Sequence, residues 1–171
     1  MTTKLHVLIL VGGRSAEHQV SIESAKNVVK SLDADRFSIT LAGIDVSGSW
    51  HLLDLERFLA LESYAGGVER ASVAKLEVLL NCVGGDFLRT EDQSALPTID
   101  VVFPVLHGPM GEDGSVQGVF ELIGVPYVGA GIVGSAVGMD KDVMKRLLRD
   151  AGIPNSKFLV FHKESFDASK L

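Results

Sequence analysis

The residues best suited to chemistry gather in one short stretch, which runs from His107 to Gly118. It holds an imidazole, four glycines and two adjacent acids, Glu112 and Asp113. Glycine permits positive φ and lets the backbone approach a ligand closely. Two carboxylates beside a histidine could act as an acid and a base. Adjacent acids before a helical run more often cap it, however, so we interpret Glu112 and Asp113 as architectural residues that hold the turn and aim His107.

A second glycine turn near the start of the chain carries a similar set of residues. Gly12 and Gly13 are followed by Glu17 and His18, and then by a run rich in Ala, Val and Lys that predicts a helix to about Leu32. A carboxylate in this place gains from the helix dipole, so position alone favours a capping role for Glu17. Gly12-Gly13 by itself is a weak indication of a dinucleotide site, because no Gly-x-Gly-x-x-Gly follows.

Each glycine turn follows an apolar run that predicts a buried strand. These runs are Leu5 to Val11 and Ile99 to Leu106, and Phe37 to Ile44 predicts a third strand. Runs of this kind are typical of parallel strands covered on both faces. The alternation of strands and helices predicts an α/β fold with a doubly wound, mostly parallel, Rossmann-like sheet. Ligands bind outside the carboxyl ends of such strands, so both turns are expected to face one crevice.

The rest of the chain gives weaker signals. We expect a turn at Ser47-Gly48 before a short strand, a helix over residues 55–61 capped by Asp54, and a helix over 115–123 that ends at Gly124. Residues 65–98 are hard to interpret, with one possible strand over 77–80 and loops at 84–85 and 91–97. A helical segment over 131–151 is expected to break near Gly138 and to end at Gly152, and residues 157–161 are expected to begin a new strand.

Composition excludes several classes of protein. The chain has 171 residues, 46% apolar and 22% charged, as in a globular domain with a substantial core. A net charge of −6 without a basic stripe argues against nucleic-acid binding. Cys82 is the only cysteine, which excludes an intramolecular disulfide and favours a reducing compartment. The apolar run at the amino terminus lacks the features of a signal peptide, and no run is long enough to cross a membrane, so we expect a cytoplasmic protein.

Three ordered motifs resemble those of D-alanine-D-alanine ligases, members of the ATP-grasp superfamily. Residues 107–118 fit the pattern His-Gly-x-x-Gly-Glu-Asp-Gly-x-x-Gln-Gly without a mismatch, and residues 12–21 fit Gly-Gly-x-Ser-x-Glu-His-x-Val-Ser. The third motif is Gly-Met-Asp-Lys at 138–141, followed by Lys145 and by Gly-Ile-Pro at 152–154. The resemblance runs from about Leu5 to Phe161.

This resemblance changes how several residues are interpreted. It implies that Glu17 binds the ammonium of the first D-alanine, that Val20 lies against the small side chain of that substrate, and that His107 lies beside its amino and carboxylate groups. It also implies that Lys141, which position alone would make a surface cation, reaches nucleotide phosphate. The histidines at 6, 51 and 162 are interpreted as structural, and His18 as adjacent to the site but pointing elsewhere.

The resemblance implies a two-step reaction that feeds peptidoglycan synthesis. The carboxylate of one D-alanine attacks the γ-phosphate of ATP to give an acyl phosphate, and the amine of a second D-alanine displaces phosphate. Residues 1–152 would form an amino-terminal, substrate-side pre-ATP-grasp domain, and residues 153–171 would begin the ATP-grasp domain. The ligands of Mg²⁺ and the adenine pocket would lie downstream, so the chain alone is expected to be inactive. A homodimer is implied by family habit.

Two other functions remain open at this stage. A non-catalytic binding or regulatory domain on a Rossmann-like or flavodoxin-like sheet would need only the crevice. A dinucleotide-dependent oxidoreductase is the least favoured alternative. Within the ligase class, a D-alanine-D-lactate product also remains open, because the residues that select the second substrate lie mostly beyond Leu171.

Overall fold

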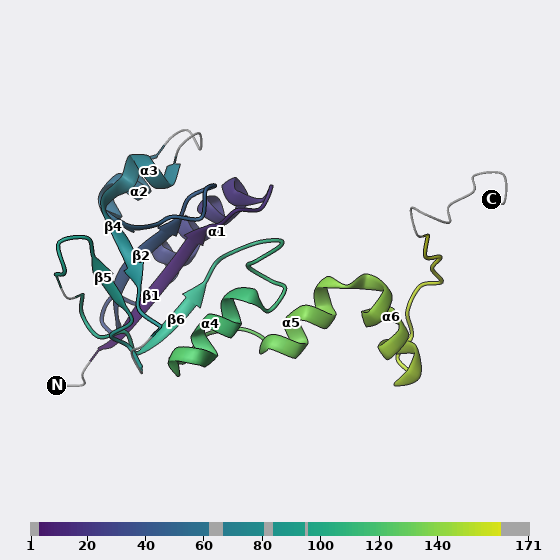
Figure 1. Cartoon of the computed structure of the whole chain (residues 1–171). Coiled ribbons are helices and arrows are strands. Elements are labelled where there is room, and N and C mark those ends of the chain that lie inside the picture. Colours follow the sequence, from purple (N-terminus) through teal and green to yellow (C-terminus); the bar gives the residue numbers. More distant parts are fainter. Residues whose placement is uncertain (1–3, 62–66, 81–83, 95, 162–171) are drawn as a thin grey trace.

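One six-stranded sheet organises the computed structural model (Figure 1). The structure describes residues 4–61, 67–80, 84–94 and 96–161. The strands are β1 (Leu5–Gly12), β2 (Phe37–Ile44), β3 (Trp50–Leu53), β4 (Ser72–Val78), β5 (Leu88–Thr90) and β6 (Val101–Pro104). The helices are α1 (His18–Ser31), α2 (Leu55–Leu59), α3 (Gly67–Ala71), α4 (Ser115–Ile123), α5 (Ile132–Met139) and α6 (Lys141–Asp150).

The sheet has a parallel half and an antiparallel half, in the order β5-β4-β3-β2-β1-β6. β1 lies between β6 and β2 and is parallel to both, as the apolar runs predict. The pairs β2-β3, β3-β4 and β4-β5 are antiparallel. The α/β class is therefore confirmed, whereas parallel pairing is confined to three strands. The reason is local, because a tight turn at residues 45–49 returns the chain beside β2 without a crossover helix.

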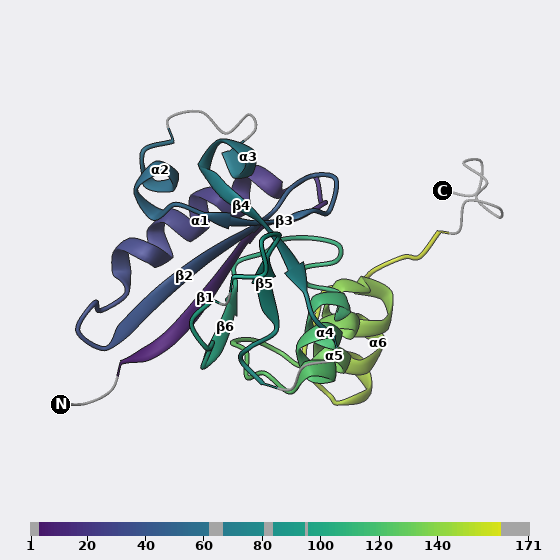
Figure 2. The ribbon, with the colours of Figure 1, turned by 60° about the vertical axis from the view of Figure 1, so that its left-hand side comes forward.

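Helices cover both faces of the sheet, which makes the fold doubly wound (Figure 2). Alternate residues of β1 point to opposite faces. Val7, Ile9 and Val11 join a core with α1, α2 and α3, whereas Leu8 and Leu10 join a core with α4. All five are buried. β1 is thus the middle strand of the parallel half, and the turn that follows it lies between the two layers.

The two turns of interest lie at the carboxyl ends of β1 and β6, as expected. β6 is shorter than the predicted strand. The backbone bonds from Asp100 N to His6 O and from Val105 N to Leu10 O nevertheless extend the pairing by a residue at each end. On its other side β6 meets only an isolated bridge between Val102 and Tyr127. His107 follows directly.

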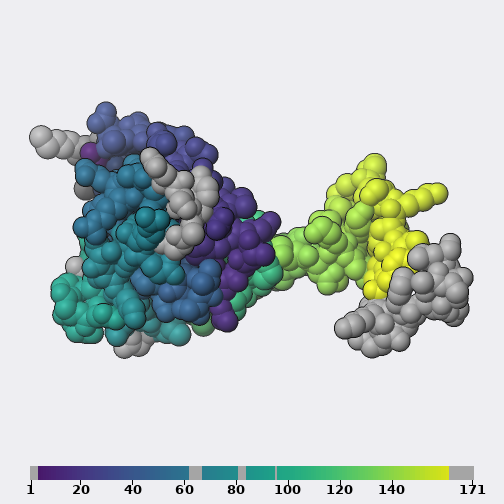
Figure 3. All heavy atoms as spheres, turned by 90° about the horizontal axis from the view of Figure 1, so that it is seen from above, coloured from purple at the N-terminus to yellow at the C-terminus, as the bar shows by residue number. Residues whose placement is uncertain are grey.

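The segment after α4 leads away from the sheet (Figure 3). Gly124 ends α4 in the left-handed conformation, as predicted. The break expected near Gly138 falls at Asp140, where the Asp140 carboxylate caps α6 by accepting bonds from the amides of Asp142 and Val143. Gly152, with φ of +70°, ends α6 as expected.

The strand predicted over residues 157–161 is wrong, since these residues have no strand pairing. A strand requires a partner that accepts its backbone hydrogen bonds. Within the described residues, this segment instead lies beside α6, where Lys145 donates to Ser156 Oγ at 2.7 Å and stacks on the ring of Phe158. No helix of the described part is long and apolar enough to cross a membrane.

Candidate active site

Two serine hydroxyls join the glycine turns. Ser15 Oγ donates to His107 O at 2.6 Å. Ser21 Oγ accepts from Gly12 N at 2.7 Å and donates to Val105 O. The end of β1, the start of α1 and the end of β6 are therefore connected through buried or half-buried hydrogen bonds. This network fixes the relative position of the two turns.

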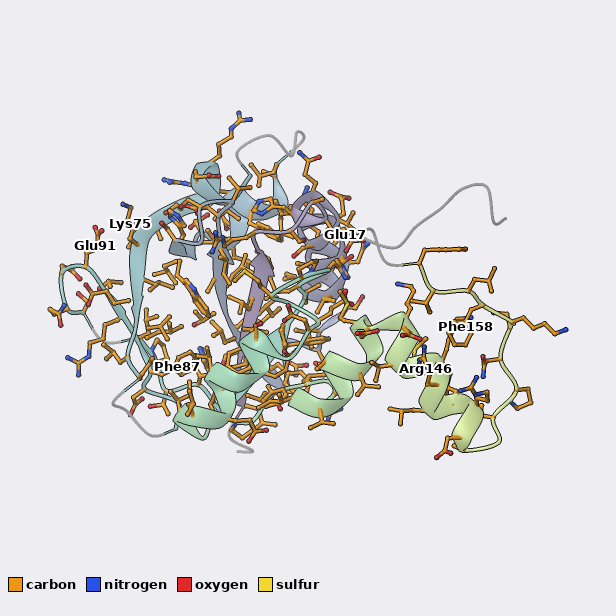
Figure 4. All side chains as sticks on the ribbon, turned by 45° about the vertical axis from the view of Figure 1, so that its right-hand side comes forward. Glu17, Lys75, Phe87, Glu91, Arg146 and Phe158 are labelled. Atoms are coloured by element: carbon orange, nitrogen blue, oxygen red, sulfur yellow. The ribbon has the colours of Figure 1, made fainter. Side chains whose placement is uncertain are left out.

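Glu17 lies at the start of α1, with its carboxylate over the second turn (Figure 4). A Cβ added to Gly108 would come within 2.9 Å of Glu17 Oε2, and Gly108 has φ of +73°. Glycine at 108 therefore makes room for the carboxylate. The Glu17 side chain makes no capping bond, and no ion partner for it occurs in the described part of the chain. Glu17 is exposed, so its carboxylate is available to a ligand.

His107 faces the same side of α1. Its Nε2 lies 3.1 Å from Ser24 Oγ, and the imidazole is half-buried. Glu17, Val20 and Ser24 are spaced by three and four residues, which places them on one helical face. Val20 is 53% exposed. The structure thus brings a free carboxylate, a small apolar side chain and an imidazole to one surface.

The acids of the second turn hold its backbone. Glu112 Oε2 accepts from Gly108 N at 2.7 Å. Asp113 accepts from Met110 N at 2.8 Å and from Ser115 N at 3.0 Å. The bond from the Met110 amide is the largest cause of the lowered pKa of Asp113; burial opposes it and the Ser115 bonds add to it. Both acids thus hold the backbone of the turn, as the architectural interpretation predicts.

His18 supports the first turn from below. It is buried, and its Nδ1 lies 2.7 Å from Gly13 O. As expected, His18 points away from the exposed face of α1 that carries Glu17 and Val20. His6, between Ser38 and Thr40, and His51, beside Asp45, also have structural partners. His162 and Cys82 lie outside the described residues.

Lys141 does not join the other predicted site residues. It is exposed at the first position of α6, on the segment that leads away from the sheet. Ser15, Ser21 and Ser24 are the site residues that sequence reasoning missed. The helical spacing of Ser24 from Glu17 was the one signal that could have found it. No group of three or more His, Cys, Asp or Glu side chains among the described residues could hold a metal ion.

A family model described as the D-ala D-ala ligase N-terminus matches residues 6–130. The chain belongs to the D-alanine-D-alanine ligase family. The match includes both glycine turns and all of the sheet except Leu5.

Individual members of the D-alanine-D-alanine ligase family agree with this. A D-alanine-D-alanine ligase of Shouchella clausii is 44% identical over 168 residues, which are 96% of this chain and 46% of that protein. The solved D-alanine-D-alanine ligase of Coxiella burnetii is 41% identical with a TM-score of 0.78, over 88% of this chain and 43% of that one. A Bacillus anthracis ligase complexed with ATP is 25% identical with a TM-score of 0.60, over 99% and 42%. The chain thus spans less than half of each relative.

Proposed function

We propose that this chain forms the first-substrate side of an ATP-dependent ligase that joins two D-alanines. The observation that carries the proposal is the Glu17 carboxylate beside the His107 turn, which has no partner among the described residues. An amino acid presents an ammonium, a carboxylate and a side chain, and this surface offers a complement to each. Glu17 would bind the ammonium, His107 would lie beside the amino and carboxylate groups, and Val20 would contact the methyl group.

The surface also suits the small side chain of D-alanine. Val20 is exposed and short, so a methyl group can pack on it while a larger side chain would have to extend into solvent. The serine network keeps His107 and Glu17 at a fixed spacing, and such preorganisation is what the positioning of a reacting group requires. The first D-alanine would thereby be held with its carboxylate directed to the nucleotide.

The reaction would then follow the family's two steps. The bound D-alanine carboxylate would attack the γ-phosphate of ATP, and the amine of a second D-alanine would displace phosphate from the acyl phosphate. Lys141 would contact nucleotide phosphate, and Mg²⁺ would neutralise charge on the phosphates. The described residues offer no cluster for Mg²⁺, so its ligands would come from elsewhere in the protein.

Several further assignments belong to this proposal. Residues 1–152 would be the substrate-side domain, and residues 153–171 would begin the ATP-grasp domain. We also propose a cytoplasmic homodimer that supplies peptidoglycan synthesis and has no nucleic-acid or membrane partner. The acidic net charge of −6 supports the absence of a nucleic-acid surface.

The test is product analysis with the full-length gene product. The protein is incubated with ATP, Mg²⁺ and D-alanine, and the amounts of D-alanyl-D-alanine and phosphate are measured over time. We expect the two products to form in equal amounts. D-lactate in competition with D-alanine tests the second substrate. Formation of the dipeptide supports the proposal. Binding of D-alanine without ATP turnover would contradict the proposal and favour the non-catalytic binding domain instead.

A further inference from the structure

A hollow lies at the carboxyl ends of β1, β2 and β6, beside the core that α4 covers. It has a volume of about 310 Å³ and lies between three loops. These loops follow β1 at Gly13, join β2 to β3 at Gly48, and follow β6 at His107. Glu17 and Val20 do not line it. The hollow therefore shares the His107 turn with the candidate active site but does not include Glu17 or Val20.

Its walls are mainly apolar. The side chains on its floor belong to the core under α4 or pack against it. They are Ile44, Trp50, Leu106 and Val116. Val119 of α4 also lines the hollow. Its volume is at the lower end of the range for pockets that hold small ligands, and apolar walls with a few polar groups are typical of such pockets. An apolar body of small size would fit it.

One cation lies at its rim. The Arg14 side chain passes over Gly48, where an added Cβ would stand 3.0 Å from Arg14 Cδ. The guanidinium is exposed, and it has no hydrogen-bond or ion partner among the residues that the structure describes. Gly48, with φ of +99°, allows this close approach.

The acids near the hollow are already bonded. Asp45 Oδ1 accepts from the amides of residues 47, 48 and 49, and its Oδ2 lies 2.9 Å from His51 Nε2. Asp113 is occupied by the amides of Met110 and Ser115. Neither carboxylate neutralises Arg14. The hollow therefore combines apolar walls with one positive charge that no carboxylate of the described part of the chain neutralises.

We propose that this hollow binds a small carboxylate with an apolar body, whose carboxylate pairs with Arg14. Charge complementarity decides the class, because an ammonium or a neutral polar end would leave the guanidinium without a partner. The apolar part of the ligand would lie on Trp50, Leu106 and Val119. This site shares the His107 turn with the proposed substrate side, but it uses neither Glu17 nor a phosphate contact, so binding here can be tested separately from catalysis.

Trp50 makes the proposal directly testable, because it is the only tryptophan of the 171-residue chain. The chain is titrated with 3-phenylpropionate and with its neutral isostere 3-phenylpropanamide while tryptophan fluorescence is recorded. We expect the carboxylate to bind about threefold to tenfold more tightly than the amide, as for a partly exposed ion pair. Equal affinities, or no fluorescence change with either compound, would overturn the proposal.

Variants separate the charge from the hollow. Arg14→Gln should make the two affinities equal, whereas Arg89→Gln, at an exposed position on β5, should leave the preference unchanged. Val119→Phe should fill the hollow and abolish binding of both compounds. Circular dichroism melts establish that each variant is folded. Retained binding by a folded Val119→Phe, or a retained preference in Arg14→Gln, would show that the ligand binds elsewhere.

Discussion

At the scale of single residues, three carboxylates near the glycine turns differ in what their oxygens already bind. Glu112 and Asp113 accept hydrogen bonds from backbone amides of their own turn, whereas Glu17 has no such partner in the described part of the chain. A bonded carboxylate stabilises a loop, while a free one can bind a ligand. The sequence motif presents all three alike, and hydrogen bonding distinguishes them.

Glu17→Gln in the full-length protein should weaken use of the first D-alanine. A neutral amide cannot replace a charge-assisted bond to an ammonium, which contributes about 1.5 to 3 kcal/mol, or roughly tenfold to more than a hundredfold in affinity. Steady-state kinetics on D-alanine measure this. Glu56→Gln, on the exposed surface of α2, is the control. An unchanged KM and kcat in Glu17→Gln would remove Glu17 from the site.

His107→Ala should lower activity, whereas Asp113→Ala should lower stability. His107 makes one half-buried side-chain bond, to Ser24, so its loss should lower activity on the order of tenfold or more while stability changes by less than about 1 kcal/mol. Asp113→Ala should lower stability by about 0.5 to 2 kcal/mol, because two amides lose their acceptor. Thermal melts and rates on both variants check this. Equal losses of activity with unchanged melts would make Asp113 a catalytic acid.

At the scale of elements, the β2-β3 turn shows how a buried acid shapes a loop. Burial raises the pKa of Asp45, but hydrogen bonds from Ser47, His51 and Ser49 outweigh it and hold the pKa well below its usual range. A lowered pKa in the folded state stabilises the protein above the unfolded value of about 4. This contribution is lost as the pH falls from there toward the folded pKa.

Asp45→Ala should therefore destabilise the protein by about 1 to 3 kcal/mol at pH 7, since several donors, His51 among them, lose their acceptor. The difference from the original protein should shrink between pH 4 and pH 2. Urea unfolding at a series of pH values measures both. Glu91→Gln, an exposed carboxyl in a loop, should show neither effect. A difference that stays constant with pH would mean that packing, rather than ionisation, stabilises the turn.

Elements were predictable where one physical signal dominated. The apolar runs gave β1 and β2 almost to the residue, and Asp54 caps α2 through Arg57 N as expected. α3 and β5 were missed, and only the end of β4 was foreseen. These segments are short, and β5 at the sheet edge takes its conformation from pairing with β4. Pairing between distant residues leaves no local pattern, so residues 65–98 could not be interpreted from the sequence.

At the scale of the whole molecule, the sheet and its two cores stand apart from α5, α6 and the segment that follows (Figure 3). The latter part exposes large apolar side chains. Val133 is 76% exposed, Leu147 51% and Leu159 78%. No residue of α6 is buried. Large exposed apolar side chains gathered in one segment indicate a part of the molecule that packs against other protein.

The 171-residue chain by itself should fold but not turn over ATP. Its sheet is packed on both faces, which supports a cooperative melt with a mixed α/β circular dichroism spectrum. The phosphoryl transfer step needs a metal ion and several phosphate contacts, whereas the described residues offer an exposed Lys141 and no metal cluster. Phosphate release with ATP, Mg²⁺ and D-alanine should stay at background, with the full-length protein as positive control. Turnover by the 171-residue chain would mean that these residues hold the nucleotide and the metal themselves, and the proposed division between a substrate side and a downstream nucleotide side would be wrong.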